Sequence, residues 1–111
     1  MKSSHIPNES FSDYKFHALI RQENDGSVTA RSEEMDIVAG ASSEEEACLQ
    51  LAKAIIDYSR EFSTDFSRYS NMPGGREKIP YVVKAILLGC PENIIPEMVF
   101  RPDSHRHQTS P

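Results

Sequence analysis

The spacing of apolar residues changes once along this chain, and that change constrains the fold more than any other feature. From Tyr14 to Ile20, apolar and polar residues largely alternate, which is the two-residue period of a strand with one buried face. From Cys48 to Tyr69, apolar residues recur every three or four positions, which is the period of an amphipathic helix. A chain of 111 residues with both patterns predicts one small α+β domain.

Turn signals divide the first part of the chain into strands. Glu23-Asn24-Asp25-Gly26 favours a tight turn, so the strand from Tyr14 should pair with residues 27–31 as a hairpin. An acidic bend and a third apolar run, Met35 to Ala39, follow and end at Gly40. We expect a three-stranded antiparallel β-meander, since two strands alone are marginal in water, and a fourth strand elsewhere stays open.

A strong helix start follows the meander. Ser43 and Glu46 have the spacing of a capping box, and Glu44, Glu45 and Glu46 suit the positive end of a helix dipole. The apolar stripe predicts one long or kinked helix over 43–71, packed on the sheet and stopped by Met72-Pro73-Gly74-Gly75. Phe62, Phe66 and Tyr69 need cover from the C-terminal segment or from a second chain, and the sequence leaves that choice open.

The remainder of the chain predicts shorter elements. Residues 79–88, with Pro80 near the start and Gly89 after the end, favour a short helix, with a strand as the alternative. Residues 94–100 predict a short, weak element interrupted by Pro96, and Gly74-Gly75-Arg76 is interpreted as a linker. The expected organisation is a flexible arm (1–12), a β-β-β-α domain (13–72), a C-terminal extension (73–101) and a disordered tail (102–111).

The charge pattern bears on the kind of partner. The net charge is −5, and residues 32–57 hold seven acidic residues against Lys53 alone. No basic stripe is present to neutralise phosphates, so we do not expect free-standing nucleic-acid binding; the acidic cluster favours a basic partner instead. No apolar stretch approaches the roughly 18 residues of a membrane span. We expect a cytoplasmic protein in which Cys48 and Cys90 are reduced thiols.

No group of residues predicts catalysis, a metal site or a cofactor. His105 and His107 are two imidazoles on a tail, and a metal site generally needs more ligands on an ordered scaffold. Glu33, Glu34 and Asp36 are expected on or beside a strand, where adjacent side chains point to opposite faces and do not converge on an ion. His17, on the polar side of the first strand, is expected to be a surface histidine.

One family shares the order of these signals. The strand from Tyr14, the Asp25-Gly26 turn, the strand ending in Val38-Ala39-Gly40 and the Ser43-Glu44-Glu45-Glu46-Ala47 helix start resemble the HicB-like antitoxins over about 14–62. That resemblance implies a degenerate, partial RNase H-like β-β-β-α(-β) fold without RNase catalysis. It also implies binding and masking of a small basic RNA-cleaving toxin, and in many members repression of their own operon through DNA.

The leading hypothesis is therefore a non-catalytic antitoxin with a basic toxin as its partner. A homodimer is expected, and operator DNA only in the complex, because residues 79–100 carry a single basic residue, Lys84. The alternatives are a solitary RNase H-like metal-dependent nuclease and a DNA-binding repressor acting alone. The predicted partner-binding residues combine acidic side chains with the C-terminal apolar segment: Glu33, Glu34, Asp36, Tyr81, Lys84, Ile94 and Met98.

Overall fold

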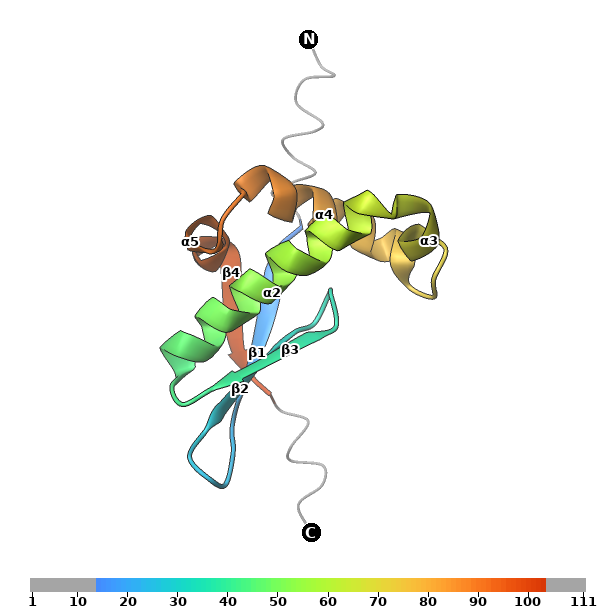
Figure 1. The fold of residues 1–111 in the computed structure, drawn as a ribbon. Helices are drawn as coiled ribbons and strands as arrows, with labels where there is room; N and C mark the ends of the chain where they lie inside the picture. Colours follow the sequence, from blue (N-terminus) through green and yellow to red (C-terminus); the bar gives the residue numbers. More distant parts are fainter. Residues whose placement is uncertain (1–13, 104–111) are drawn as a thin grey trace.

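The computed structural model describes residues 14–103 and has the predicted mixed α+β architecture (Figure 1). The predicted arm, the end of the predicted tail and the pair His105 and His107 lie outside these residues. The elements in chain order are β1 (Phe16–Gln22), β2 (Val28–Ser32), β3 (Ile37–Ala41), α2 (Glu44–Thr64), α3 (Phe66–Ser70), α4 (Gly75–Leu88), α5 (Pro91–Ile94), the 3₁₀ helix η1 (Ile95–Glu97) and β4 (Met98–Pro102).

Four strands form one sheet in the order β3-β2-β1-β4. The first three are the predicted antiparallel meander, and β4 is the fourth strand left open by the sequence; it runs parallel to β1. In the first turn, Asp25 Oδ1 accepts hydrogen bonds from the backbone N–H of Ser27 at 3.0 Å and its hydroxyl at 2.7 Å, and Gly26 has a φ of 91°. The Asp-Gly pair therefore sets the hairpin register.

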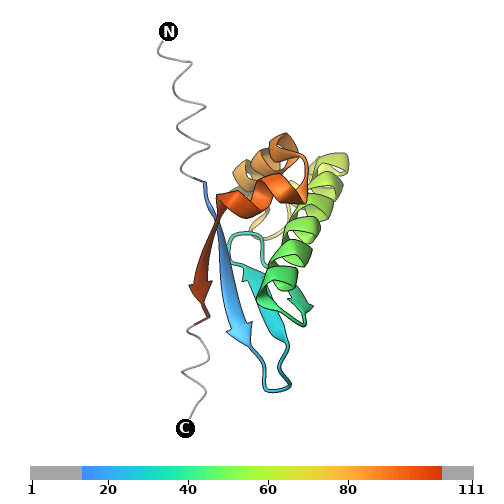
Figure 2. The ribbon, with the colours of Figure 1, turned by 90° about the vertical axis from the view of Figure 1, so that its left-hand side faces the viewer.

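The helices gather on one side of the sheet (Figure 2). α2 begins as predicted, because the Ser43 side chain accepts a hydrogen bond from the Glu46 backbone N–H at 3.2 Å. The sequence predicted either one long helix or a kinked one, and the structure has the kinked form: the helix breaks at Asp65 and resumes as α3. The helical stripe packs on β2 and β3 and shares one core with the buried residues of β1; Leu51, Ala52 and Ile55 are fully buried.

The linker predicted at Gly74-Gly75-Arg76 is wrong, because α4 begins at Gly75. Gly74 takes the left-handed conformation with φ of 76°, and the Gly75 N–H donates to the Met72 carbonyl at 2.8 Å. A Cβ at Gly75 would lie 2.1 Å from the Tyr69 carbonyl oxygen, so only glycine fits this tight reversal. The prediction failed because the two glycines were taken only as helix breakers, whereas here they allow a close turn from one helix into the next.

The cover for the second half of the long helical segment comes from the chain itself. α4 packs across α2, and α3 folds back so that the Tyr69 ring stacks on Phe62 at 5.5 Å between centroids. Phe62 is fully buried, while Phe66 stays half exposed. The C-terminal extension is thus part of the same core. The helix expected at 79–88 is confirmed and ends at Gly89, whose N–H donates to the Ala85 carbonyl at 3.0 Å.

The last predicted weak element is a short helical passage followed by a strand. α5 and η1 carry residues 91–97 over the end of the sheet, and β4 reaches Pro102, the first residue of the predicted tail. Within residues 14–103, every helix is too short or too polar to cross a lipid bilayer.

Candidate functional site

An acidic turn connects β2 to β3, and its geometry differs from that expected of strand residues. Residues Glu33 to Asp36, here called the acidic turn, lie between the two strands. The Asp36 N–H donates to the Ser32 carbonyl at 2.9 Å, and Asp36 has a φ of 59°. Because these residues form a turn, the alternation of a strand does not apply to them. The expectation that their side chains cannot converge was therefore wrong for Glu33 and Glu34.

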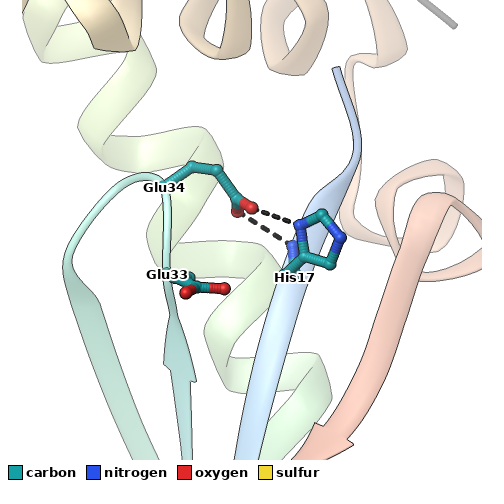
Figure 3. A group of neighbouring side chains, drawn as sticks. All are labelled: His17, Glu33 and Glu34. Carbon is teal, nitrogen blue, oxygen red and sulfur yellow. Dashed lines mark hydrogen bonds and ion pairs between the residues drawn. The ribbon is translucent and has the colours of Figure 1, made fainter. Parts of the chain in front are cut away.

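Glu34 reaches back to the start of β1 and contacts His17 (Figure 3). One carboxylate oxygen accepts a hydrogen bond from the His17 backbone N–H at 2.9 Å, and the other contacts the His17 ring Nδ1. The Glu34 side chain is only 13% exposed and that of His17 32%. The sequence predicted a surface histidine without a partner. In the structure, His17 instead forms a partly buried pair with Glu34.

Glu33 extends the same cluster towards β4. Its carboxylate accepts a hydrogen bond from Arg101 Nη2 at 2.9 Å, and both side chains are about half exposed (50% and 53%). Such an exposed ion pair contributes at most about 1 kcal/mol to stability. It nevertheless links the acidic turn to a strand 68 residues further along the chain.

His17, Glu33 and Glu34 each offer one ligand atom, and these atoms lie within 4.8 Å of one another. One histidine and two carboxylates are donors that divalent transition metals accept. In this arrangement, however, both Glu34 oxygens already face His17, and the Arg101 guanidinium brings a positive charge beside Glu33. A cation would have to displace these contacts, so the geometry favours an ion-paired network.

Tyr81, a predicted contact residue, lies beside this cluster. Its ring packs edge-on against Tyr14 at 5.3 Å between centroids, and it lies tilted against Phe16 at 6.0 Å. Burial raises the pKa of the Tyr81 phenol above its ordinary value, and the Glu34 carboxylate and Tyr14 raise it further. Tyr81 therefore joins Glu33 and Glu34 in one region, while Asp36 lies exposed at the end of the acidic turn.

Three other predicted contact residues serve the fold itself. Ile94 is fully buried and Met98 is 7% exposed, both within the main core. Lys84 is also buried, and its Nζ donates to the Tyr14 carbonyl at 2.9 Å and pairs with Glu97 at 3.0 Å. The side chains of Lys84, Ile94 and Met98 are enclosed because α4, α5 and β4 pack into the core, and their role in partner binding stays a prediction.

Sequence reasoning missed His17 and Arg101 as members of the cluster. A usable signal existed for His17, because the hairpin pairs Ala18 with Ser32. Counting one residue outward puts His17 opposite Glu33, and the Glu33 N–H indeed donates to the His17 carbonyl at 3.0 Å. Arg101 gave no such signal, since the pairing of β4 with β1 joins distant parts of the sequence.

The sequence prediction also did not include a second acidic region among the candidate binding sites. The first turn of α2, Glu44 to Glu46, is exposed and borders a hollow of about 480 Å³. Its lining comes from α2, η1 and β4: Glu44, Glu45, Cys48, Ile95 and Phe100. Burial raises the pKa of the Cys48 thiol, and the Glu44 carboxylate raises it further. The hollow thus joins an apolar floor to an acidic rim.

The fold and these two acidic regions define a small α+β module, with one four-stranded sheet packed against a long helix. Its fold matches a crystal structure, described as the antitoxin part of a proposed toxin/antitoxin system from Syntrophomonas wolfei subsp. wolfei, with a TM-score of 0.78. The two sequences are 23% identical, and the match covers 88% of this chain and 70% of that one. At this identity the likeness concerns the fold alone.

The family model supplies the functional class. Residues 1–98 match the PHD-like family, described as antitoxins of toxin–antitoxin systems of the RelE/RelB type. The chain belongs to this family and is an antitoxin of a toxin–antitoxin system. Among curated proteins, no match to the chain was found. Membership implies a cognate toxin as partner and a role in binding, which agrees with the general class predicted from the sequence.

Proposed function

We propose that this antitoxin binds a small, basic, RNA-cleaving toxin and covers its RNA-binding site without making or breaking a bond. The observation that carries the proposal is the combination of the family match with the exposed acidic residues at the start of α2, on a chain of net charge −5. A surface that binds RNA phosphates must be basic, so the same surface is attracted to exposed carboxylates. Opposite charge speeds docking, and apolar contacts then hold the complex.

We further propose that the chain is HicB-like within the broader class of antitoxins. The order of elements, three antiparallel strands, a long helix and a fourth strand beside β1, supports a partial RNase H-like fold of the β-β-β-α-β type. The matched family is described as PHD-like, so both the HicB-like assignment and the type of toxin are part of this proposal.

The associated proposals concern assembly and place in the cell. We propose a homodimer, supported by an apolar stripe on the outer side of α4, where Val83, Ile86 and Leu87 are 39%, 41% and 68% exposed. Mass measurement by light scattering tests the dimer, and a monomer at micromolar concentration contradicts it. We propose that only the complex with the toxin binds operator DNA. We also propose a cytoplasmic location, because a toxin that cleaves RNA acts in the cytoplasm.

The test is co-expression with the small basic open reading frame next to the gene for this chain. We expect expression of the neighbour alone to stop growth, co-expression to restore it, and the two proteins to elute as one complex. Restored growth with loss of the complex at high salt supports electrostatic docking. If the neighbour leaves growth unchanged when expressed alone, or forms no complex, the proposed function is wrong.

The nuclease alternative has one observation in its favour, the group of His17, Glu33 and Glu34. We expect the purified chain to leave RNA intact with magnesium or manganese, because the carboxylates of Glu33 and Glu34 are engaged by Arg101 and His17. The decisive comparison is wild type against Glu34→Gln. Metal-dependent cleavage that disappears in this variant contradicts the non-catalytic proposal.

A further inference from the structure

The outer edge of β4 is open to another strand. β4 lies at the end of the sheet and pairs with β1 on one side, and no other strand within residues 14–103 pairs with it. The Asp103 N–H donates to the Ile20 carbonyl of β1 at 2.9 Å. Because backbone groups alternate along a strand, the N–H and C=O of Phe100 point away from β1. Pro102 faces the same outer edge and has no N–H, so a partner strand must be short and centred on Phe100.

The side chain of Phe100 lies on the helix side of the sheet, next to the hollow described above. Phe100 pairs with Ala18, whose side chain is in the core under the helices. It lines the hollow together with Ile95, yet remains 42% exposed. An aromatic ring left open beside an unpaired strand edge is a surface that a partner can cover.

The acidic rim of the hollow decides which side chain fits there. Glu44 and Glu45 are exposed, and neither forms an ion pair with another of residues 14–103. A strand added about 4.8 Å from β4 would turn every second side chain towards this hollow. Arginine and lysine suit it, because their aliphatic stems pack on apolar surface while their charged ends reach carboxylates, and a cation near Phe100 also gains from the ring.

We propose that the toxin docks here through an extended, arginine- or lysine-bearing segment that adds a strand to the outer edge of β4. One basic side chain of that segment enters the hollow over Phe100 and pairs with Glu44 and Glu45. Backbone hydrogen bonds at Phe100 give affinity, and the acidic rim selects a basic segment. This inference rests on the proposed function, since its occupant is the toxin.

A second copy of the chain fits this edge less well. Pairing of two β4 strands about a two-fold axis brings the two acidic rims to the same junction, where like charges repel. The charge of the rim therefore favours a basic partner over self-association at this edge.

The first experiment measures affinity for the product of the neighbouring open reading frame by titration calorimetry. We expect Glu44→Lys/Glu45→Lys to weaken binding at least about tenfold, because two attractive contacts become repulsive. The matched control is Asp57→Lys/Glu61→Lys, which makes the same change in net charge at two exposed acids further along α2. We expect this control to weaken binding less than about threefold. Equal losses in both double variants overturn the proposal.

The second experiment does not depend on folding of a variant, because it follows backbone amides of the wild-type chain by hydrogen exchange. On binding, we expect the Phe100 amide to exchange at least about tenfold more slowly, while amides of β3, at the opposite sheet edge, keep their rates. An unchanged Phe100 amide overturns the proposal. So does a Phe100 amide already protected in the free chain, or protected by self-association, because another segment or copy then occupies the edge.

A synthetic peptide of alternating arginine and valine separates this inference from the proposed function. If the neighbour's product does not bind, but the peptide protects the Phe100 amide and a glutamate-valine peptide does not, the docking chemistry is supported and only the proposed function fails. If the neighbour's product binds without protecting Phe100, the proposed function stands and the docking site is wrong. Absence of protection by both the product and the arginine peptide overturns the docking site.

Discussion

The two acidic regions of this antitoxin carry similar charge but use it differently. In the acidic turn, Glu34 faces His17 and Glu33 pairs with Arg101, so the chain supplies partners for these two carboxylates. In the first turn of α2, Glu44 and Glu45 have no ion pair with another of residues 14–103. A count of acidic residues therefore does not measure the charge that is available to a partner, because paired charges attract other molecules less.

Because their carboxylates differ in pairing, the two acidic regions should contribute differently to the stability of the fold and to partner binding. Removing a carboxylate from the acidic turn should cost fold stability, since it leaves polar groups without their partner. Removing one from the start of α2 should change docking and leave the fold nearly unaffected. The acidic turn is therefore mainly structural, and the α2 start is the better candidate for contact with a basic protein.

The first prediction concerns the buried Lys84, which stabilises the core behind both acidic regions. Lys84→Met should lower the free energy of unfolding by about 2 kcal/mol, because it leaves the Tyr14 carbonyl without its charged donor and the partly exposed Glu97 without its cation. Lys53→Met, at an exposed position on α2, should change stability by less than about 0.5 kcal/mol. Chemical denaturation checks both, and a Lys84→Met protein as stable as wild type would mean that this ion pair does not hold α4 to η1.

A smaller effect compares the two acidic regions directly. Glu34→Ala should destabilise the fold by about 1.5 kcal/mol, since the carboxylate that accepts the His17 N–H is largely buried. Glu45→Ala should cost less than about 0.5 kcal/mol, the value of an exposed charge near a helix N-terminus. Thermal unfolding at one pH and salt concentration gives both numbers, and equal losses would break the distinction between the regions.

The smallest effect concerns the floor of the hollow. Because its pKa is raised, Cys48 should stay protonated at pH 8 and react with iodoacetamide at least about tenfold more slowly than Cys90. As pH rises towards the raised pKa, thiolate forms and the rate should increase. Glu44→Gln removes one of the causes, so alkylation at pH 8 should accelerate about twofold, as followed by mass spectrometry. A rate unchanged by Glu44→Gln would place this carboxylate away from Cys48 in solution.

Local patterns predicted the elements near the meander and the long helix well. The Asp25-Gly26 turn and the Ser43 cap occur where the sequence indicates them, because a positive φ and a free helix N–H are demands met by neighbouring residues. Gly75 shows the limit of such reasoning. Gly75 must be a glycine because any larger side chain would collide with the Tyr69 carbonyl oxygen of α3, and no local pattern reveals that contact.

The candidate site was predicted only in part for a related reason. Glu33 and Glu34 were chosen for their charge, but their partners His17 and Arg101 come from two other strands. Ile94 and Met98 were chosen as apolar contact residues, and the packing of α5 and β4 encloses them. Apolar residues in a short C-terminal segment serve equally well in a core or at an interface, and only the position of the segment distinguishes the two uses.

Local patterns in the sequence indicate the three strands of the meander and the helix start, since these follow from the directions and capping needs of neighbouring residues, and composition gives the excess of negative charge. The fold as a whole was needed to establish that β4 pairs with β1, that Tyr69 of α3 stacks on Phe62, and which carboxylates find a cation within the chain. Those outcomes require residues tens of positions apart to meet, and such meetings are fixed by the packing of the whole core, which periodicity along the chain does not encode.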